Sequence, residues 1–324
     1  MGRTLAVVVL CALVLSGAAL AGEPGFAPVE PASPNAERIN DSYYWVAIFT
    51  GAIFLIVQVA LVWFLIRYRR RQRDRSEDGA QVHGNTNIEI AWSVAPVLIL
   101  VAIGAFIFYK LPGIQDVPSA SAQGGRLEVD VKGYRYYWQF EYPNGVVAID
   151  TLRAPADQNV RLSITAPDFD VIHSWWVPSL GGKFDAIPGT VNETWFNVSR
   201  PGVYRGQCAE FCGIQHAAMK AQVEVVPRGE FDGWLEDEQR AQAAGTSELG
   251  RQTFEGVCAK CHGLAGEGDI GVPLKGNAIL RDAAAVEQVV RHGQGKMPPV
   301  GTDWSDRQMK ALTDYLEKEL LGGS

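Results

Sequence analysis

The sequence has few of the side chains that bind soft metals. Its 324 residues include only five cysteines, five histidines and four methionines. Four cysteines form two close pairs, Cys208 with Cys212 and Cys258 with Cys261. Both pairs are interpreted as cofactor ligands, so no structural disulfide framework is expected. An excess of positive charge is also missing, because the net charge is −7, and nucleic-acid binding is therefore not indicated.

The first 21 residues form a predicted secretory signal. Arg3 is followed by an apolar run over residues 5–15 and by Ala-Leu-Ala ending at Ala21, the small-residue pattern of a cleavage site. Cys11 lies inside the apolar run and is expected to leave with it; a lipid-modified cysteine is the alternative. The remaining length suffices for two globular domains together with membrane segments.

Two apolar stretches predict a helical hairpin in a lipid bilayer. Residues 41–68 are almost wholly apolar and exceed the ~20 residues that a membrane-spanning helix needs. A run of arginines between positions 67 and 75 marks the cytoplasmic end of this helix. A second span over 88–111 returns the chain to the outside. Residues 22–40 are thus expected to be an irregular extracytoplasmic segment and 69–87 a cytoplasmic loop.

Glu89 lies at the start of the second span. The sequence Thr86-Asn-Ile-Glu89 fits a capping box, in which the glutamate reaches back to the beginning of the helix. Physical chemistry alone therefore assigns Glu89 a structural role.

Within a predicted domain over residues 112–228, residues 126–226 show the period-two pattern of short strands. Val160, Leu162 and Ile164 alternate with polar neighbours, and turn residues separate such runs. The expected fold is an all-β sandwich of the cupredoxin type. Residues 134–142 carry an aromatic side chain at every second position, which predicts a strand with one face in the core.

Four soft ligands fall within twelve residues of this domain. They are the thiolates, imidazole and thioether of Cys208, Cys212, His216 and Met219. A thioether beside thiolates and imidazole favours copper. The two cysteines can bridge two copper ions, with His173 as a second imidazole and the backbone carbonyl of Glu210 as a further donor. A C-x3-C disulfide and a structural zinc site are the alternatives, and neither requires the methionine.

The predicted copper loop joins two strands. These cover residues 203–205 and 221–225, while His173 is expected on an earlier connection. A rigid sandwich that holds metal ligands with little reorganisation suits electron transfer.

A second cofactor signal lies near the C-terminus. The sequence Cys258-Ala-Lys-Cys261-His262 attaches a c-type haem, with both thiols in thioether bonds and His262 as an axial iron ligand. Two methionines could supply the sixth ligand. Met297, on a loop rich in glycine and proline, is the predicted ligand, because Met309 has the helical spacing of a core residue.

The haem motif sits in a predicted α-helical domain over residues 246–324. Ser305-Asp-Arg-Gln308 is a capping box that opens its last helix. Residues 229–245 are charged and are expected to form a partly helical linker between the two extracytoplasmic domains.

From about residue 40 to 228 the chain resembles subunit II of the haem–copper cytochrome c oxidases, whose dinuclear CuA centre carries the copper motif. The resemblance includes Val177-Pro-Ser-Leu180 and Lys183-Phe-Asp-Ala-Ile-Pro188. It implies a CuA ligand set of His173, Cys208, Glu210 through its carbonyl, Cys212, His216 and Met219. It further implies that the Glu210 carboxylate contributes to a magnesium site at the interface with subunit I.

Residues 246–324 resemble class I cytochromes c, and the fusion resembles subunit II of the caa-type oxidases. The resemblance implies an electron-input subunit that passes electrons from haem c to CuA and on to haem a of subunit I, where oxygen is reduced to water with proton translocation. The implied partners are subunits I and III and a soluble or membrane-bound cytochrome c or other donor. The implied location is the bacterial inner membrane, with both cofactor domains on the periplasmic side.

The resemblance also suggests individual roles. In this family a tryptophan of the aromatic segment receives the electron, and the alignable position here is Tyr136, with Trp138 two residues later. Both are therefore candidates. Glu89 resembles the glutamate of subunit II at the mouth of the proton path into subunit I, a role compatible with helix capping. No bond-making catalytic residue is expected in this chain.

Other functions use similar motifs. A nitric oxide reductase with a CuA subunit could use much the same chain. Nitrous oxide reductase shares the copper motif, but its catalytic copper cluster needs many more than five histidines. A membrane-tethered copper-binding or delivery module is the non-enzymatic alternative, and it leaves the haem motif unexplained.

Overall fold

The computed structural model describes residues 27–69, 81–118, 125–246 and 248–321. The predicted signal and most of the arginine-rich run lie outside these residues. The chain divides into two compact units. One is the stretch Glu37–Ile114, and the other combines the chain up to Ala36 with Gln115–Ser324.

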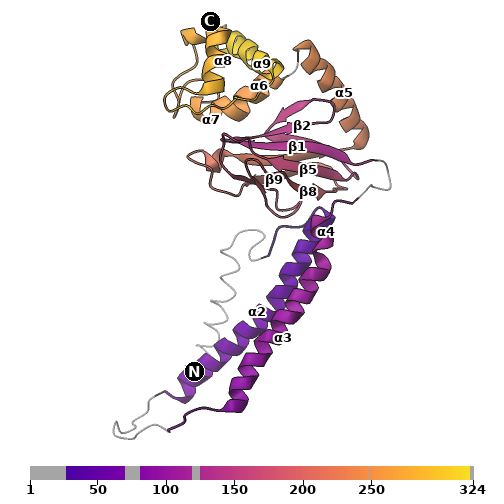
Figure 1. Cartoon of the computed structure of the whole chain (residues 1–324), viewed down its shortest axis with the longest axis vertical. Coiled ribbons are helices and arrows are strands. Elements are labelled where there is room, and N and C mark those ends of the chain that lie inside the picture. Colours follow the sequence, from indigo (N-terminus) through magenta and orange to yellow (C-terminus); the bar gives the residue numbers. More distant parts are fainter. Residues whose placement is uncertain (1–26, 70–80, 119–124, 247, 322–324) are drawn as a thin grey trace, which may run out of the picture. The chain divides into compact units, whose positions relative to one another are not determined.

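The stretch from 37 to 114 is a pair of apolar helices (Figure 1). Helix α2 covers Pro34–Arg67, helix α3 covers Thr86–Lys110 and the short α4 covers Pro112–Gln115. The two long helices have the length and composition to cross a membrane. Trp45 of α2 stacks on Phe106 of α3, with ring centroids 4.8 Å apart, so the helices pack antiparallel as predicted. Helix α2 begins at Pro34, inside the segment expected to be irregular, because proline is favoured at the first helical position.

The cap of α3 differs by one residue from the predicted one. Asn85 is the N-cap, and its side chain accepts a hydrogen bond from the Ile88 amide at 3.3 Å. Glu89 Oε1 accepts from the Asn85 amide at 3.2 Å. Thr86 is therefore the first helical residue rather than the cap, although Glu89 makes the expected return contact.

The middle of the chain is the predicted β-sandwich, built from two five-stranded sheets. In the first sheet the order is β3-β2-β1-β5-β8, with bounds Val147–Ile149, Tyr137–Glu141, Leu127–Tyr134, Val160–Thr165 and Asn192–Phe196. In the second the order is β4-β10-β9-β6-β7, with bounds Thr151–Pro155, Lys220–Val226, Gly202–Cys208, His173–Trp176 and Phe184–Ala186. Val160, Leu162 and Ile164 of β5 are fully buried between the sheets, which confirms the alternation.

The aromatic stretch from 134 to 142 is not one strand. Strand β1 ends at Tyr134 and β2 begins at Tyr137, the two residues pair across the hairpin, and Tyr136 lies in the turn between them. The alternation fails because Tyr136, Tyr137 and Trp138 are consecutive aromatics, which one pleated face cannot accommodate. Trp138 and its alternating neighbours enter the sandwich core, whereas Tyr134 and Tyr137 belong to a second core.

The predicted linker is a helix that packs on the sandwich. Helix α5 covers Arg228–Ala244, and its Phe231 is buried in the sandwich core. Near its end, the Gln242 side chain accepts from the Val147 amide at 3.2 Å and donates to the Val147 carbonyl at 2.8 Å. Gly245, in the left-handed conformation with φ 71°, ends the helix.

The C-terminal part is the predicted helical domain. Its elements are α6 Leu249–Thr253, a π-helical turn Phe254–Cys258, α7 Ala259–His262, a 3-10 turn Ala278–Arg281, α8 Ala283–His292, α9 Asp306–Leu316 and a last turn Glu317–Leu321. Ser305 caps α9, accepting from the Gln308 amide at 3.2 Å. The Gln308 side chain does not close the box; it donates to Gln139 of β2 at 3.2 Å.

Candidate copper and haem sites

The pairing of strands assembles the predicted copper ligands. Cys208 is the last residue of β9, and the loop that follows reaches β10 at Lys220 through a short helical turn beginning at His216. Strand β6 pairs with β9 so that Trp175 lies opposite Cys208. His173 is thus the first residue of β6 rather than part of a connection, because its backbone pairs with Ala186 of β7.

All six predicted donors lie together. Ligand atoms of His173, Cys208 and Cys212 are within 4.8 Å of one another. The Cys208 sulfur lies 3.2 Å from the Glu210 carbonyl oxygen. The Cys212 sulfur lies 3.6 Å from His216 Nδ1 and 3.9 Å from the Met219 sulfur. These are two sulfurs at the centre, with imidazoles, a thioether and a carbonyl around them.

The two central thiols are free and 4.0 Å apart, about twice the length of a disulfide bond. The contact between the two sulfurs lowers the pKa of the Cys208 thiol and raises the pKa of the Cys212 thiol. Metal binding releases thiol protons, so both sulfurs would bind a metal as thiolates.

The buried imidazole of this cluster lacks the hydrogen-bond partners that buried polar groups normally have, as expected for a metal ligand. His173 is fully buried, yet neither ring nitrogen has a hydrogen-bond partner. Its Nε2 lies 3.5 Å from Asp170 Oδ1, too long and poorly aligned for a good hydrogen bond. Orphaned buried polar atoms are rare, and a metal ion is one explanation of them. Six donors exceed the four of a structural zinc site, and the sulfur-rich set with a thioether suits copper.

The haem motif is equally well formed. Cys258 and His262 are buried, and His262 Nδ1 lies 2.6 Å from the carbonyl oxygen of Val272. Nδ1–H donates to that carbonyl, which fixes the ring and leaves Nε2 for iron. Cys258, His262 and Met297 line two neighbouring cavities, one of which has apolar walls. Met309 lines neither and is buried in the core of the domain. Met297 therefore lines the same cavities as the haem-attachment residues, as a residue that would hold a haem must.

One haem-site cavity opens toward the sandwich. Arg135 and Tyr136 line it together with Cys258 and Cys261. Tyr136 also touches the copper loop, since a Cβ on Gly213 would lie 2.5 Å from its hydroxyl. Trp138 lies deeper, fully buried, with its ring centroid 6.1 Å from that of His173. Of the two candidate aromatics, Tyr136 therefore adjoins both sites and Trp138 adjoins the copper ligands.

Several residues that join the two sites have no role predicted from the sequence. Gln215 Nε2, in the copper loop, donates to the Lys260 carbonyl at 2.8 Å. Lys260 Nζ donates to the Tyr136 carbonyl at 2.9 Å and to Asp150 Oδ2 at 2.5 Å. The only sequence signal was position: Gln215 precedes His216, and Lys260 lies between the haem cysteines.

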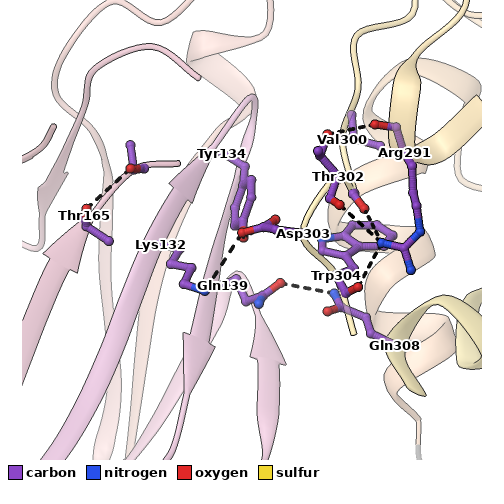
Figure 2. A network of polar contacts seen from close by, with 12 residues as sticks. Lys132, Tyr134, Gln139, Thr165, Arg291, Val300, Thr302, Asp303, Trp304 and Gln308 are labelled. Atoms are coloured by element: carbon purple, nitrogen blue, oxygen red, sulfur yellow. Dashed lines mark hydrogen bonds and ion pairs between the residues drawn. The ribbon is translucent and has the colours of Figure 1, made fainter. Parts of the chain in front are cut away.

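A polar network fastens the haem domain to strands β1 and β2 (Figure 2). Tyr134 points from β1 to Asp303, donating at 2.8 Å. Tyr137 donates to the Val300 carbonyl at 2.7 Å and accepts from the Trp304 indole at 2.8 Å. Tyr134 and Tyr137 stack with centroids 4.8 Å apart and belong to the same core as the haem-domain helices. The two domains therefore share a packed core and are not merely tethered.

Family models match three parts of the chain. A family model for the transmembrane domain of cytochrome c oxidase subunit II matches residues 25–109, and one for its periplasmic domain matches 146–226. A model for subunit III of cbb3-type cytochrome c oxidase matches residues 246–316.

Individual relatives agree. The chain is 33% identical to cytochrome c oxidase subunit 2 of Alkalihalophilus pseudofirmus over 319 residues, covering 91% of each protein. It is 36% identical to the probable cytochrome c oxidase subunit 2 of Rickettsia bellii, over 74% of this chain and 95% of that one. Among solved structures, the periplasmic domain of subunit II of cytochrome oxidase from Bradyrhizobium japonicum is 32% identical, with a TM-score of 0.35, over 38% of this chain and 97% of that one.

Fold and sites together define a membrane protein with a cupredoxin domain and a C-terminal cytochrome c domain. The chain belongs to the cytochrome c oxidase subunit II family. It is accordingly the electron-input subunit of a haem–copper oxidase and functions beside subunit I. The family implies copper in the cupredoxin domain and haem in the cytochrome domain.

Proposed function

We propose that this chain is a two-centre electron relay, with a dinuclear CuA site in the sandwich and a covalent haem c in the C-terminal domain. The observation that carries the proposal is the cluster of six donors around two free thiols 4.0 Å apart. When bound, the copper pair and the haem would each supply one one-electron centre. The protein residues hold these centres, exclude water and set the distance between them.

The copper ligands are His173, Cys208, Cys212, His216, Met219 and the carbonyl of Glu210. His173 and Cys208 lie on paired strands, and the Cys208 amide donates to the Met219 carbonyl at 2.9 Å, so the loop that carries the other ligands is tied to the sheet. Such support keeps the ligands in place when the charge of the site changes, which lowers the reorganisation that accompanies electron transfer.

The haem ligands are Cys258 and Cys261 through thioether bonds, with His262 and Met297 to iron. The hydrogen bond from His262 to the Val272 carbonyl orients the imidazole. A methionine as the sixth ligand raises the reduction potential relative to a second histidine. The apolar cavity walls formed by α8 and α9 exclude water from one face of the haem.

Tyr136 is the proposed aromatic contact on the electron path. Its ring adjoins the haem cavity, and its hydroxyl touches the copper loop at Gly213. Trp138 is the candidate one step closer to copper, beside His173. Because the fused domain covers Tyr136, an external cytochrome c or other donor would deliver electrons to haem c rather than to CuA.

The copper loop also suits contact with subunit I. Phe211 and Ile214 are each 77% exposed, an unusual condition for large apolar side chains in neighbouring positions. The Glu210 carboxylate is exposed while its carbonyl faces Cys208, so one residue could serve copper and a magnesium ion at the subunit interface. We further propose that subunit III is a partner of this chain. The complex would lie in the bacterial inner membrane, with both cofactor domains on the periplasmic side.

Copper content and spectra of the purified full-length chain test the proposal. We expect two copper ions and one haem per chain, a paramagnetic resonance signal of one electron shared between two coppers, and a low-spin Met/His haem spectrum. One copper per fully loaded chain, or Cys208 bonded to Cys212, would overturn it. The copper-delivery alternative predicts copper that a chelator removes readily. Membership of the oxidase family disfavours both copper delivery and a role in a nitric oxide reductase.

Glu89 is the proposed residue at the mouth of the proton path. Its carboxylate is exposed and bonds only the Asn85 amide among the described contacts. Glu89→Gln keeps a hydrogen-bond acceptor for that amide but cannot carry a proton. In the assembled oxidase we expect slower oxygen turnover with unchanged haem c reduction. Unchanged turnover would leave Glu89 with the capping role alone.

A further inference from the structure

The copper loop and the haem-attachment helix touch through one hydrogen bond. Gln215 Nε2 donates to the backbone carbonyl of Lys260 at 2.8 Å. Gln215 is covalently next to the copper ligand His216, and Lys260 is next to the haem-bearing Cys261. A path from one cofactor ligand to the other thus runs along covalent bonds except for this hydrogen bond.

The Lys260 carbonyl is held in place by the side chain of the same residue. Its ammonium group, only 13% exposed, pairs with Asp150 Oδ2 at 2.5 Å and donates to the Tyr136 carbonyl at 2.9 Å. Asp150 is itself tied to strand β2, since its Oδ1 accepts from the Trp138 amide at 2.9 Å and its own amide donates to the Trp138 carbonyl at 2.8 Å. The haem-attachment helix is therefore anchored to the strand that adjoins the copper ligand His173.

Gln215 is not needed to hold the domains together. Strands β1 and β2, outside the copper loop, meet the haem domain through the Tyr134–Asp303 contact (Figure 2), the Tyr137–Trp304 contact and the shared core. A neutral hydrogen bond from a half-buried side chain contributes little to stability. The position of this hydrogen bond between two cofactor ligands is therefore better explained by electronic coupling than by a role in holding the domains together.

We propose that Gln215 couples the copper loop to the haem-attachment helix, and that Lys260, anchored on Asp150, is the positioning residue for the carbonyl that Gln215 reaches. The inference rests on the proposed relay between haem c and CuA. Electronic coupling decays faster across a gap than through a bond, so the hydrogen bond shortens the effective distance between the centres. Tyr136 then lies beside this path and supports it by presenting its carbonyl to Lys260.

The test compares two leucine variants in the full-length chain loaded with copper and haem. Gln215→Leu removes the donor with little change in bulk. Gln239→Leu is the matched control, because Gln239 Nε2 also donates to a backbone carbonyl, that of Asn144 at 2.9 Å, far along the chain from either cofactor motif. After rapid photoreduction of haem c, we expect Gln215→Leu to slow electron transfer to copper by on the order of tenfold, as small errors of placement do in other reactions, and Gln239→Leu to leave it unchanged.

Lys260→Met and the double variant test the positioning role. If both residues act on one path, adding Gln215→Leu to Lys260→Met changes the rate by no more than a factor of about 2, whereas independent effects would multiply. Hydrogen exchange of the copper-free, haem-loaded chain is the second measurement. We expect exchange in residues 259–263 to rise in Lys260→Met and to match the parent in Gln215→Leu.

Three results would overturn the inference. They are a parent-like rate in Gln215→Leu, multiplied losses in the double variant, or a loss in Gln215→Leu that comes with altered copper spectra or faster exchange at the interface. Failure of the relay itself looks different, because then haem c of the parent chain would be reduced without any reduction of copper.

Discussion

Met297 and Met309 differ in what surrounds their sulfur atoms, and this difference is measurable. Met297 lines the cavities that contain Cys258 and His262, whereas Met309 is 3% exposed in the helical core. We expect Met297→Ala to abolish the sulfur-to-iron absorption band and to lower the haem potential. Met309→Ala should keep the band and cost about 2–5 kcal/mol of unfolding free energy, measured by urea titration. The opposite pattern would make Met309 the ligand.

The residue scale also shows how far the sequence alone could go. The predicted copper donors from Cys208 to Met219 and the haem motif follow from spacing and ligand chemistry, because short-range motifs encode them directly. His173 lies much earlier in the chain, and the fold brings it to the two cysteines. Gln215 and Lys260 could not be predicted, since their contact joins positions 45 residues apart and depends on how two domains meet. The cap at Asn85 was missed by one residue, because asparagine and threonine are both good caps and stand side by side.

A substitution at Gly213 tests the contact between the copper loop and the turn that joins β1 and β2. Its φ of 132° disfavours other residues, and a Cβ there would lie 2.5 Å from the Tyr136 hydroxyl. Gly213→Ala should therefore cost about 1–3 kcal/mol and loosen copper binding. Gly145→Ala is the control for backbone strain alone, because φ is 81° and no atom lies within 4 Å.

A second substitution makes the Gly213 result specific. Tyr136→Phe removes the hydroxyl that the new methyl group would meet. In the double variant we expect part of the lost stability and copper affinity to return, measured by thermal unfolding and copper titration. No recovery would show that backbone strain, rather than Tyr136, accounts for the cost.

The crossing of helices α6 and α9 depends on Gly250. A Cβ at this position would lie 2.1 Å from the backbone oxygen of Ala311, and backbone cannot move aside as a side chain can. We expect Gly250→Ala to destabilise the haem domain by about 1–3 kcal/mol, measured by urea unfolding followed in the haem absorption band. Gly233→Ala, on α5 with nothing within 4 Å, should instead raise stability by about 0.4–1 kcal/mol. Equal effects of the two changes would contradict the close crossing.

At the scale of elements, the sequence predicted the types of the secondary-structure elements better than their boundaries. The period-two pattern placed β5 and β10 correctly, because buried side chains alternate with less buried ones in both strands. Hydrophobicity predicts one strand for the aromatic stretch, because it does not show that Tyr134 and Tyr137 belong to a different core from Trp138. That second core exists only after the C-terminal domain has folded back on the sandwich.

At the scale of the whole molecule, the predicted linker is a helix that packs against the sandwich. Its charges suggested a tether, but Phe231 and Trp234 lie on one side of α5 and pack with the sandwich core. The sequence could not show this, because the few apolar residues of this helix do not define a clear apolar face until the surface on which it packs is known. A haem domain fixed in this way keeps one orientation toward copper, which a flexible tether would not do.

The shared core predicts that alkaline conditions separate the domains. Burial raises the pKa of Tyr134, with Asp303 adding to the effect, and burial raises the pKa of Tyr137 well above its ordinary value. Both phenols stay neutral in the folded chain while they would ionise near pH ~10 once exposed. For groups whose pKa is raised on folding, the stabilisation is complete below the unfolded pKa and declines as the pH rises above it, by about 1.4 kcal/mol per tyrosine and pH unit.

We therefore expect the unfolding free energy of the haem domain, measured by urea titration, to fall steeply above about pH 10. Tyr134→Phe should reduce the slope by about one proton, because phenylalanine cannot ionise. Tyr142→Phe is the control: Tyr142 is also buried with a raised pKa, but it lies in the sandwich core and donates to the Arg153 carbonyl at 2.7 Å. Hydrogen exchange at the Trp304 segment should accelerate with pH in the parent and in Tyr142→Phe, and less in Tyr134→Phe. If Tyr134→Phe leaves both the slope and the exchange unchanged, the tyrosine pair does not hold the two domains together.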